Sequence, residues 1–277
     1  MMIDLHSHIL HGLDDGPETM DESIQMCWMS YRDGVSIIVA TPHTLNGSYQ
    51  NNRSTILAKV EELNALIKKF GVQSSELGVE YPKLEDFYHC QSAICNLQSA
   101  IELKILPGAD VHFSNEILHQ LDQGEVTTVG DGKKFLILEF PFHTIPFGAE
   151  DVLFQLMARR ITPIISHPER NLEITRRPKR YYEMIRMGYF GQVTAMSLTG
   201  GFGAKIKGFA EKLLKKRLVH LIASDAHNVN ERPPGLTHAV REAEKIVGKE
   251  EARKMVTEYP KAILEGRKPY VPDPIPI

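Results

Sequence analysis

Eight side chains of metal-binding types stand where predicted strands end. Imidazole and carboxylate groups, with no thiolate among them, are ligands that suit zinc, manganese or iron. In an extended chain residues i and i+2 point the same way, so each of the pairs His6/His8 and Asp225/His227 can bind one ion together. The eight residues are His6, His8, His43, Asp110, Glu139, His167, Asp225 and His227.

The number of these side chains indicates more than one ion. Eight ligands exceed what a single ion needs, so the sequence predicts two or three ions with bridging carboxylates. Metal clusters of this kind hold and polarise phosphoryl groups. The predicted chemistry is therefore metal-dependent hydrolysis of a phosphoester. The other histidines are expected to be structural or exposed: His11, His89, His112, His119, His143, His220 and His238.

Other phosphate-handling motifs do not fit this chain. It contains neither GxGxxG nor GxxxxGK[ST], which excludes nucleotide binding by those loops. A cysteine phosphatase needs five residues between its cysteine and its arginine, whereas four separate Cys27 from Arg32 inside a predicted helix. Neither Cys90 nor Cys95 is followed by such an arginine. We therefore expect no cysteine nucleophile.

Short apolar runs alternate with helical stretches along the chain. Runs that are apolar almost throughout indicate strands buried on both faces, as in a parallel sheet covered by helices. The predicted strands are Met2–His6, Val35–Ala40, Glu102–Pro107, Phe135–Phe140, Thr162–Ser166, Phe190–Thr194 and Val219–Ser224. Thr19 and Glu22 have capping-box spacing before a helix that ends near Gly34. The other predicted helices are Arg53–Phe70, Ser114–Gln123, Ala149–Arg160, Pro178–Gly188, Ala204–Lys216, Leu236–Val247 and Lys249–Glu258, the last ending before Pro260.

Seven strands that alternate with helices fit either a (β/α)7 barrel or a doubly wound sheet. Six of the seven strands deliver a ligand type at the same end. A barrel brings those ends together on its C-terminal face, whereas an open sheet spreads them along an edge. We therefore predict a barrel with the metal cluster at the carboxyl ends of its strands. Two segments depart from the pattern: a probable insertion at 74–100 and an extended, proline-rich tail at 268–277.

A length of 277 residues suits one large α/β domain or two small ones, and we predict a single globular domain over residues 1–277. The chain is 42% hydrophobic and 24% charged, with a net charge of −3 and no basic stripe, which argues against a nucleic-acid partner. The start, MMIDLHSH, lacks the basic flank and apolar run of a signal peptide. No apolar window approaches the roughly 18 residues of a membrane span. With three sparse cysteines, these features favour a cytoplasmic location without membrane insertion.

Several strings of this sequence resemble the polymerase-and-histidinol-phosphatase (PHP) superfamily. They are DLHSHILHGLDDGP, ATPH, LILEF, ISHPER and IASDAHNVNERPP, in order from Ile3 to about Pro260. The resemblance is closest to the bacterial manganese-dependent protein-tyrosine phosphatases of capsule and exopolysaccharide operons. It implies a distorted seven-stranded barrel and three metal ions, usually Mn²⁺, bound by the eight residues above. It also implies that Arg170 and Arg232 hold the phosphate, and that Asp110 stands where relatives usually have Glu.

The expected reaction is direct hydrolysis without a covalent enzyme intermediate, in which Asp225 or a histidine assists proton transfer. A neighbouring carboxylate such as Glu169 could pair with Arg170 instead of leaving it for phosphate. The resemblance implies a phosphotyrosine protein as substrate, namely a tyrosine kinase that regulates polysaccharide export. Two alternatives remain open at this point: a small-molecule phosphatase, such as histidinol phosphatase, and a non-catalytic regulatory PHP module. The sequence leaves the oligomeric state open.

Overall fold

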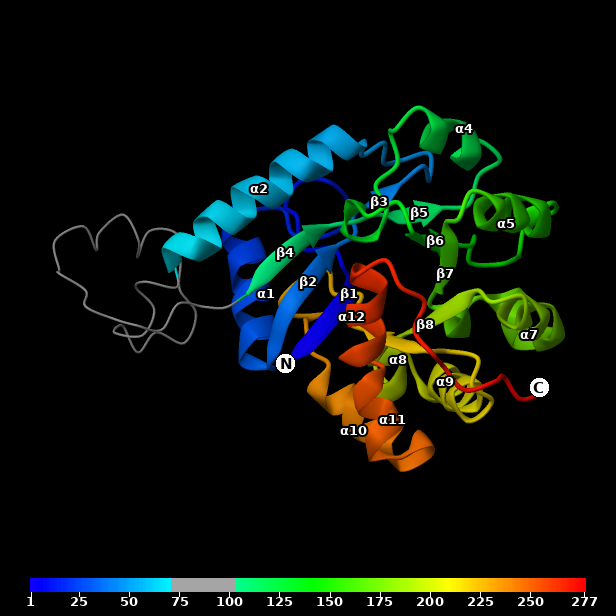
Figure 1. Ribbon diagram of the computed structural model, residues 1–277. Helices are drawn as coiled ribbons and strands as arrows, with labels where there is room; N and C mark the ends of the chain where they lie inside the picture. Colours follow the sequence, from blue (N-terminus) through cyan, green and yellow to red (C-terminus); the bar gives the residue numbers. More distant parts are fainter. Residues whose placement is uncertain (71–102) are drawn as a thin grey trace, which may run out of the picture.

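The computed structural model describes residues 1–70 and 103–277 of the chain (Figure 1). The predicted insertion at 74–100, with His89, Cys90 and Cys95, lies outside these residues. Each of the seven predicted strands has a counterpart, and two short strands follow directly after the second and the third. The described strands are β1 Met2–Ser7, β2 Val35–Ala40, β3 His43–Thr44, β4 Lys104–Pro107, β5 Asp110–His112, β6 Phe135–Glu139, β7 Thr162–Ser166, β8 Phe190–Thr194 and β9 Leu221–Ala223.

Every pairing between the described strands is parallel, as the apolar runs predict. One sheet has the order β1-β2-β4 and the other the order β3-β5-β6-β7-β8-β9. No single closed sheet forms among the described residues, so a complete barrel is not observed there. The two free ends nevertheless meet, because an isolated parallel bridge joins Ser7, at the end of β1, to Ala226, just after β9. The Asp225 amide also donates to the carbonyl of His6 at 2.8 Å.

The division into two sheets has local causes. Pro42 separates β2 from β3, and a proline has no N–H to donate to a sheet. Gly108 separates β4 from β5, and a Cβ atom at that position would lie 2.5 Å from Cγ1 of Val39. Only glycine allows this approach of the two chain segments. The short strands beyond these breaks are the ones that carry His43 and Asp110.

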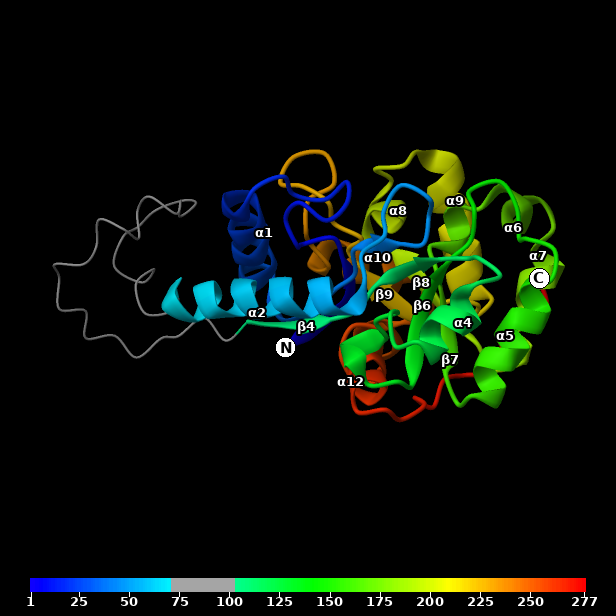
Figure 2. The same cartoon turned by 90° about the horizontal axis from the view of Figure 1, so that it is seen from above.

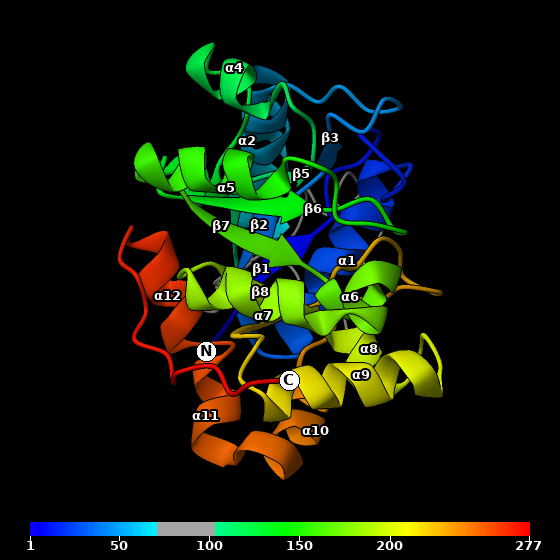
Figure 3. The ribbon, with the colours of Figure 1, turned by 90° about the vertical axis from the view of Figure 1, so that its right-hand side faces the viewer.

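Helices cover both sheets. In Figure 1, α1 and α2 lie beside the first sheet and α5 and α7 beside the second, and Figure 2 shows the strands between these two groups. Figure 3 shows α7 and α9 side by side on the face turned toward the viewer. The helices are α1 Met20–Arg32, α2 Arg53–Phe70, α4 Ile117–Asp122, α5 Ala149–Ala158, α6 Leu172–Arg176, α7 Pro178–Arg186, α8 Ala195–Thr199, α9 Ala204–Lys215, α10 Thr237–Val247, α11 Lys249–Lys254 and α12 Glu258–Leu264, with short 3-10 turns η1 Val129–Asp131 and η2 Pro168–Arg170.

The prediction for the last helix was wrong in its extent. The predicted helix Lys249–Glu258 ends at Lys254, and a separate helix, α12, runs through Pro260. Pro260 lies in the first turn of α12, where a backbone N–H has no intrahelical acceptor and proline is therefore tolerated. The predicted helix start at Thr19 is confirmed, since its side chain accepts from the Glu22 amide at 3.3 Å.

The core contains strand residues together with the buried faces of the helices that cover them. Strands β6 and β7 are buried along nearly their whole length, which explains why their sequences lack a polar alternation. Residues 268–277 form neither helix nor strand, and the Ile275 amide donates to the Lys216 carbonyl at 2.9 Å. No helix in the described part of the chain is long and apolar enough to cross a membrane.

Candidate metal centre

Seven of the eight predicted ligands fall into three overlapping groups at the carboxyl ends of the strands. Within each group, one potential ligand atom per residue lies within 4.8 Å of all the others. Strand register explains part of this, because His43 pairs with Asp110 between β3 and β5. The groups are His8, Asp15, His43 and His227; His6, His8 and Asp225; and His43, Asp110 and Glu139.

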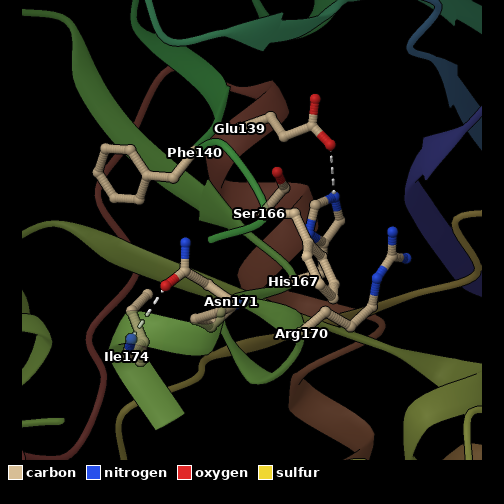
Figure 4. Close-up of a pocket in the computed structure, with 9 residues that line it drawn as sticks. Glu139, Phe140, Ser166, His167, Arg170, Asn171 and Ile174 are labelled. Carbon is tan, nitrogen blue, oxygen red and sulfur yellow. Dashed lines mark hydrogen bonds and ion pairs between the residues drawn. The ribbon is translucent and has the colours of Figure 1, made fainter. Parts of the chain in front are cut away.

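His167, the eighth predicted ligand, lies beside the third group. Its Nε2 is 3.4 Å from Oε1 of Glu139 and 3.8 Å from Oδ2 of Asp110. In Figure 4 the Glu139 carboxylate faces the His167 ring, and the Arg170 side chain extends along the same side. The structure therefore brings all eight predicted side chains into one region.

Asp15 was not among the predicted residues. It lies in the loop between β1 and α1, and its Oδ1 is 3.5 Å from Nε2 of His227 and 3.6 Å from Nε2 of His43. Its neighbour Asp14 is bonded instead to Nδ1 of His8, at 2.6 Å. A search limited to strand ends misses such loop residues. The available signal was the paired aspartates of HGLDDGP, which is too common to decide alone.

Hydrogen bonds at Nδ1 orient three of the histidine rings. Nδ1 of His6 donates to Oε1 of Gln192, at 2.9 Å, and Nδ1 of His8 donates to Asp14. Nδ1 of His227 donates to the backbone carbonyl of Asp225, at 2.9 Å. When Nδ1 carries the proton, Nε2 keeps a free lone pair, as a metal-binding histidine requires. Gln192 lies on β8, the strand for which no ligand was predicted. This strand therefore contributes a hydrogen-bond acceptor that orients the His6 ring.

Several buried polar atoms of the cluster lack hydrogen-bond partners in the described part of the chain, which indicates whether a cation would fit among them. Nδ1 of His43, Oδ2 of Asp110 and Nε2 of His227 are buried and find no hydrogen-bond partner within the described ranges. Such atoms normally cost about 1–3 kcal/mol each when they are unsatisfied. A bound cation would satisfy all three, and imidazole with carboxylate is a donor set for divalent transition metals. The residues present therefore fit a metal centre.

The electrostatics of the cluster favour positive charge. Burial lowers the pKa of His8, but the carboxylates of Asp14 and Asp225 outweigh burial and raise this pKa to about 10. Burial lowers the pKa of His6 to about 4 despite Asp110 and Asp225. Burial would raise the pKa of Asp225, yet Arg170 and the neighbouring histidines hold it well below 3.8. Ionised carboxylates that attract a proton to His8 would attract a metal cation equally.

Arg170 and Arg232, the predicted phosphate-binding residues, meet at Asp225. Arg170 Nη1 donates to Asp225 Oδ2, and Arg232 Nη2 donates to the same oxygen at 2.7 Å. Glu169 forms no ion pair with Arg170 in the described structure; its Oε1 accepts from the Thr194 amide and the Ser197 hydroxyl. The partner of Arg170 is thus a member of the cluster itself.

Two cluster residues have a backbone conformation that is rare for their type. His167 has φ = 31° and Asp225 has φ = 52°, both in the left-handed region that non-glycine residues seldom adopt. Conformations of this kind persist where the surrounding structure fixes them, and they are enriched at functional sites. His167 directly follows β7 and Asp225 is the second residue after β9, so both turns lie at the carboxyl ends of strands, where the cluster is.

Of the histidines expected to be structural or exposed, His112 contacts a residue of the cluster. Its Nδ1 lies 3.2 Å from Oε2 of Glu139, which it faces in the β5–β6 register. His220 is buried, and its Nδ1 accepts from the Gly191 amide at 3.2 Å, so its contact is structural. His11 contacts the Lys59 ammonium.

The fold and the cluster define a class of protein: parallel α/β proteins with a histidine- and carboxylate-rich candidate metal centre at the carboxyl ends of the strands. The family model described as "Capsular polysaccharide synthesis, CpsB/CapC" matches residues 2–81 and 80–265. The chain belongs to this CpsB/CapC family.

Named relatives extend over the whole chain. It is 32% identical over 276 residues to the tyrosine-protein phosphatase YwqE of Bacillus subtilis (strain 168). This alignment covers 100% of this chain and 96% of the relative. It is 30% identical over 270 residues to the tyrosine-protein phosphatase CpsB of Streptococcus agalactiae serotype III (strain NEM316). This alignment covers 96% of this chain and 99% of the relative.

A solved structure agrees with the sequence relationship. It is one of those described as YwqE from Bacillus subtilis and CpsB from Streptococcus pneumoniae, unique metal-dependent tyrosine phosphatases. The two chains superpose with a TM-score of 0.85 at 32% identity, covering 100% of this chain and 99% of the other. At this coverage the likeness extends to the segments that carry the cluster.

Proposed function

We propose that this chain is a metal-dependent protein-tyrosine phosphatase. The observation that carries the proposal is the meeting of two sites at one residue: Asp225 faces the histidine cluster through Oδ1 and two arginines through Oδ2. A metal centre beside a pair of guanidinium groups suits a phosphoryl group. Full-length relatives named tyrosine-protein phosphatases support the same conclusion.

The metal would be held by nine side chains, namely the eight predicted ligands and Asp15. We propose two or three Mn²⁺ ions, with zinc or iron as alternatives, because the donors are imidazole and carboxylate only. When bound, such ions supply Lewis acidity and activate water as a nucleophile. Asp110 Oδ2 lies within 3.8 Å of His6, His43 and His167, so a shorter side chain than Glu reaches the centre of the cluster.

The arginines would hold the substrate. A guanidinium presents paired N–H groups that match two oxygens of a phosphoryl group. Arg232 Nε is buried without a hydrogen-bond partner in the described residues, which leaves a donor for an incoming anion. Asp225 accepts from both arginines and so keeps them together in the absence of substrate. It is also our candidate for assisting proton transfer, although a tyrosine leaving group, with a pKa of about 10, needs little protonation.

The larger setting is part of the proposal. The two sheets would act as one distorted seven-stranded barrel, in which β3 continues β2, β5 continues β4, and the Ser7–Ala226 bridge links the ends. We propose a single domain in the cytoplasm. Its partner would be a phosphotyrosine protein, namely a tyrosine kinase that regulates capsule or exopolysaccharide synthesis. The CpsB/CapC family match supports this setting.

Steady-state kinetics on two substrates test the proposal. We expect kcat/KM for a phosphotyrosine peptide to exceed that for histidinol phosphate by at least about tenfold, a difference of about 1.4 kcal/mol in transition-state binding. Thiol alkylation should leave the rate unchanged, since we expect no cysteine nucleophile; Cys27, the cysteine within the described ranges, is buried, and burial raises the pKa of its thiol. A preference for histidinol phosphate would indicate a small-molecule phosphatase. Metal-loaded protein with no activity on either substrate would indicate a regulatory module.

A further inference from the structure

Phe202 contacts both arginines of the site. The Cζ atom of Arg170 lies over the Phe202 ring, 5.0 Å from its centroid, and the Cζ atom of Arg232 lies over the same ring at 5.9 Å. Both distances are within the range of about 6 Å in which a cation is attracted to an aromatic face. No role was predicted for Phe202, and it carries none of the chemistry described above.

The two guanidinium groups need more than Asp225 to stay together. They bear like charges and converge on one carboxylate oxygen, which can balance only one of them. The negative face of an aromatic ring attracts both cations without accepting a hydrogen bond. The N–H edges of the guanidinium groups therefore remain available for a carboxylate or a phosphoryl group.

The loop that carries Phe202 is suited to presenting its ring. Gly200 ends α8 with φ = 92°, and Gly203 precedes α9 with φ = 90°, so both residues adopt a conformation that favours glycine. Phe202 lies between these two turns and is only partly buried. Helix α9, which starts directly after the loop, packs against η2, the turn that contains Arg170. The loop and the arginine are thus held on adjoining elements.

We propose that Phe202 is a positioning residue that holds Arg170 and Arg232 side by side for a substrate phosphoryl group. The proposal deepens the phosphatase function and rests on it for its kinetic consequences. It makes a chemical distinction that can be tested: an aromatic ring at position 202 is required, and an apolar side chain of similar size does not replace it.

Phe202→Leu and Phe202→Tyr distinguish a need for an aromatic ring from a need for an apolar side chain alone. We expect Phe202→Leu to lower kcat/KM for a phosphotyrosine peptide about tenfold, while Phe202→Tyr stays within about twofold of the wild type. Metal content should be unchanged in both. In the Arg170→Ala background Phe202→Leu should lose most of its effect, because the two residues act as a unit. The exposed Phe154, on α5, provides the matched control, and Phe154→Leu should have no effect.

A second readout does not depend on activity. Protons over the face of an aromatic ring are shielded, so the side-chain Nε–Hε resonances of Arg170 and Arg232 should move downfield in Phe202→Leu and not in Phe154→Leu. Unmoved resonances would overturn the proposal, as would equal kinetic losses in the Leu and Tyr variants or full additivity with Arg170→Ala. If the wild type does not hydrolyse the peptide, the proposed function fails, whereas the resonance shifts still decide the position of the ring.

Discussion

At the residue scale, Asp225 connects the candidate metal centre to the candidate phosphate site. Its Oδ1 lies 3.5 Å from Nε2 of His6 and 3.4 Å from Nε2 of His8, while its Oδ2 accepts from Arg170 and Arg232. Its backbone has a positive φ and is bonded to His6 through its amide. A single carboxylate therefore lies between the histidines of the candidate metal centre and the two arginines.

Arg170→Ala should lower kcat/KM for a phosphotyrosine peptide by about 100-fold or more. The arginine is mostly buried beside the cluster, and the loss of one preorganised donor to a transition state has a cost of this size. Steady-state kinetics measure the change. Arg170→Lys should recover only part of it, because an ammonium cannot make the two-pronged contact.

Metal analysis of the same Arg170 variants provides the control. The ion content should equal that of the wild type, since arginine is not a ligand. Wild-type kinetics in Arg170→Ala would transfer the phosphate-binding role to Arg232. A loss of ions would instead mean that Arg170 supports the cluster through Asp225.

Asp15→Asn should lower the number of ions bound per chain. Asp15 is the only carboxylate in the group with His8, His43 and His227, and an amide is a much weaker ligand for a transition metal. Elemental analysis of the purified variant measures the effect, with Asp151→Asn on α5 as the exposed control. An unchanged ion count in Asp15→Asn would remove this residue from the metal centre.

The grouping of the eight side chains predicted as ligands could be inferred from the sequence, because each stands at the end of an apolar run and strand ends are readily located. Asp15, Gln192 and Phe202 could not be found in this way. Asp15 lies in a loop, Gln192 acts through His6, and Phe202 contacts arginines on other elements. Such roles depend on packing between distant segments, which a local pattern does not contain.

At the element scale, the strands were the most predictable feature. Runs such as VSIIVA are long and apolar enough that their tendency to be buried is sufficient to predict a strand. The short strands β3 and β5, which follow the second and third predicted strands, were not predicted, although Pro42 and Gly108 mark the breaks before them. The boundary at Pro260 was wrong because a proline can begin a helix as well as end one.

One helix start is stabilised from a distant part of the chain. Asp33, the residue after α1, accepts from the backbone amides of Leu236 and Thr237 at the beginning of α10, at 2.6 and 2.9 Å. Asp33→Ala should therefore lower the free energy of unfolding by about 1–2 kcal/mol, the usual cost of removing a helix cap. Urea denaturation measures the change. Asp33→Asn keeps an acceptor oxygen and should lose less, so equal losses in both variants would contradict the capping role.

At the scale of the whole molecule, a buried histidine outside the cluster links stability to pH. Burial lowers the pKa of His220 to about 4, whereas the unfolded ring titrates near 6.5. The neutral ring thus contributes stability that is present above pH 6.5 and is lost as the pH falls toward 4. Between pH 7.5 and pH 5 this contribution should fall by about 2 kcal/mol.

Comparison with His220→Gln isolates that contribution, because glutamine does not titrate and can still accept a hydrogen bond. Urea denaturation at the two pH values should show a loss for the wild type that exceeds the loss for the variant by about 2 kcal/mol. Identical losses would mean that His220 is not responsible for the pH dependence. Thiols and arginines do not titrate in this range and leave the comparison unaffected.

The sequence predicted the parallel α/β class, but not how the sheets close. Closure depends on the contact between the ends of β1 and β9, which are more than 200 residues apart, and on breaks that divide the strands into two sheets. The convergence of ligand types was nevertheless predictable, because parallel strands present their carboxyl ends on the same side.

The number of ions bound per chain, measured together with the rate on a phosphotyrosine peptide, tests the central claim most directly. Protein stripped with a chelator should be inactive. Mn²⁺ should restore the rate better than Mg²⁺, because imidazole ligands suit Mg²⁺ poorly. Full activity should require more than one ion per chain. Full activity with at most one bound ion, or activity that survives complete removal of metal, would contradict a multinuclear phosphatase.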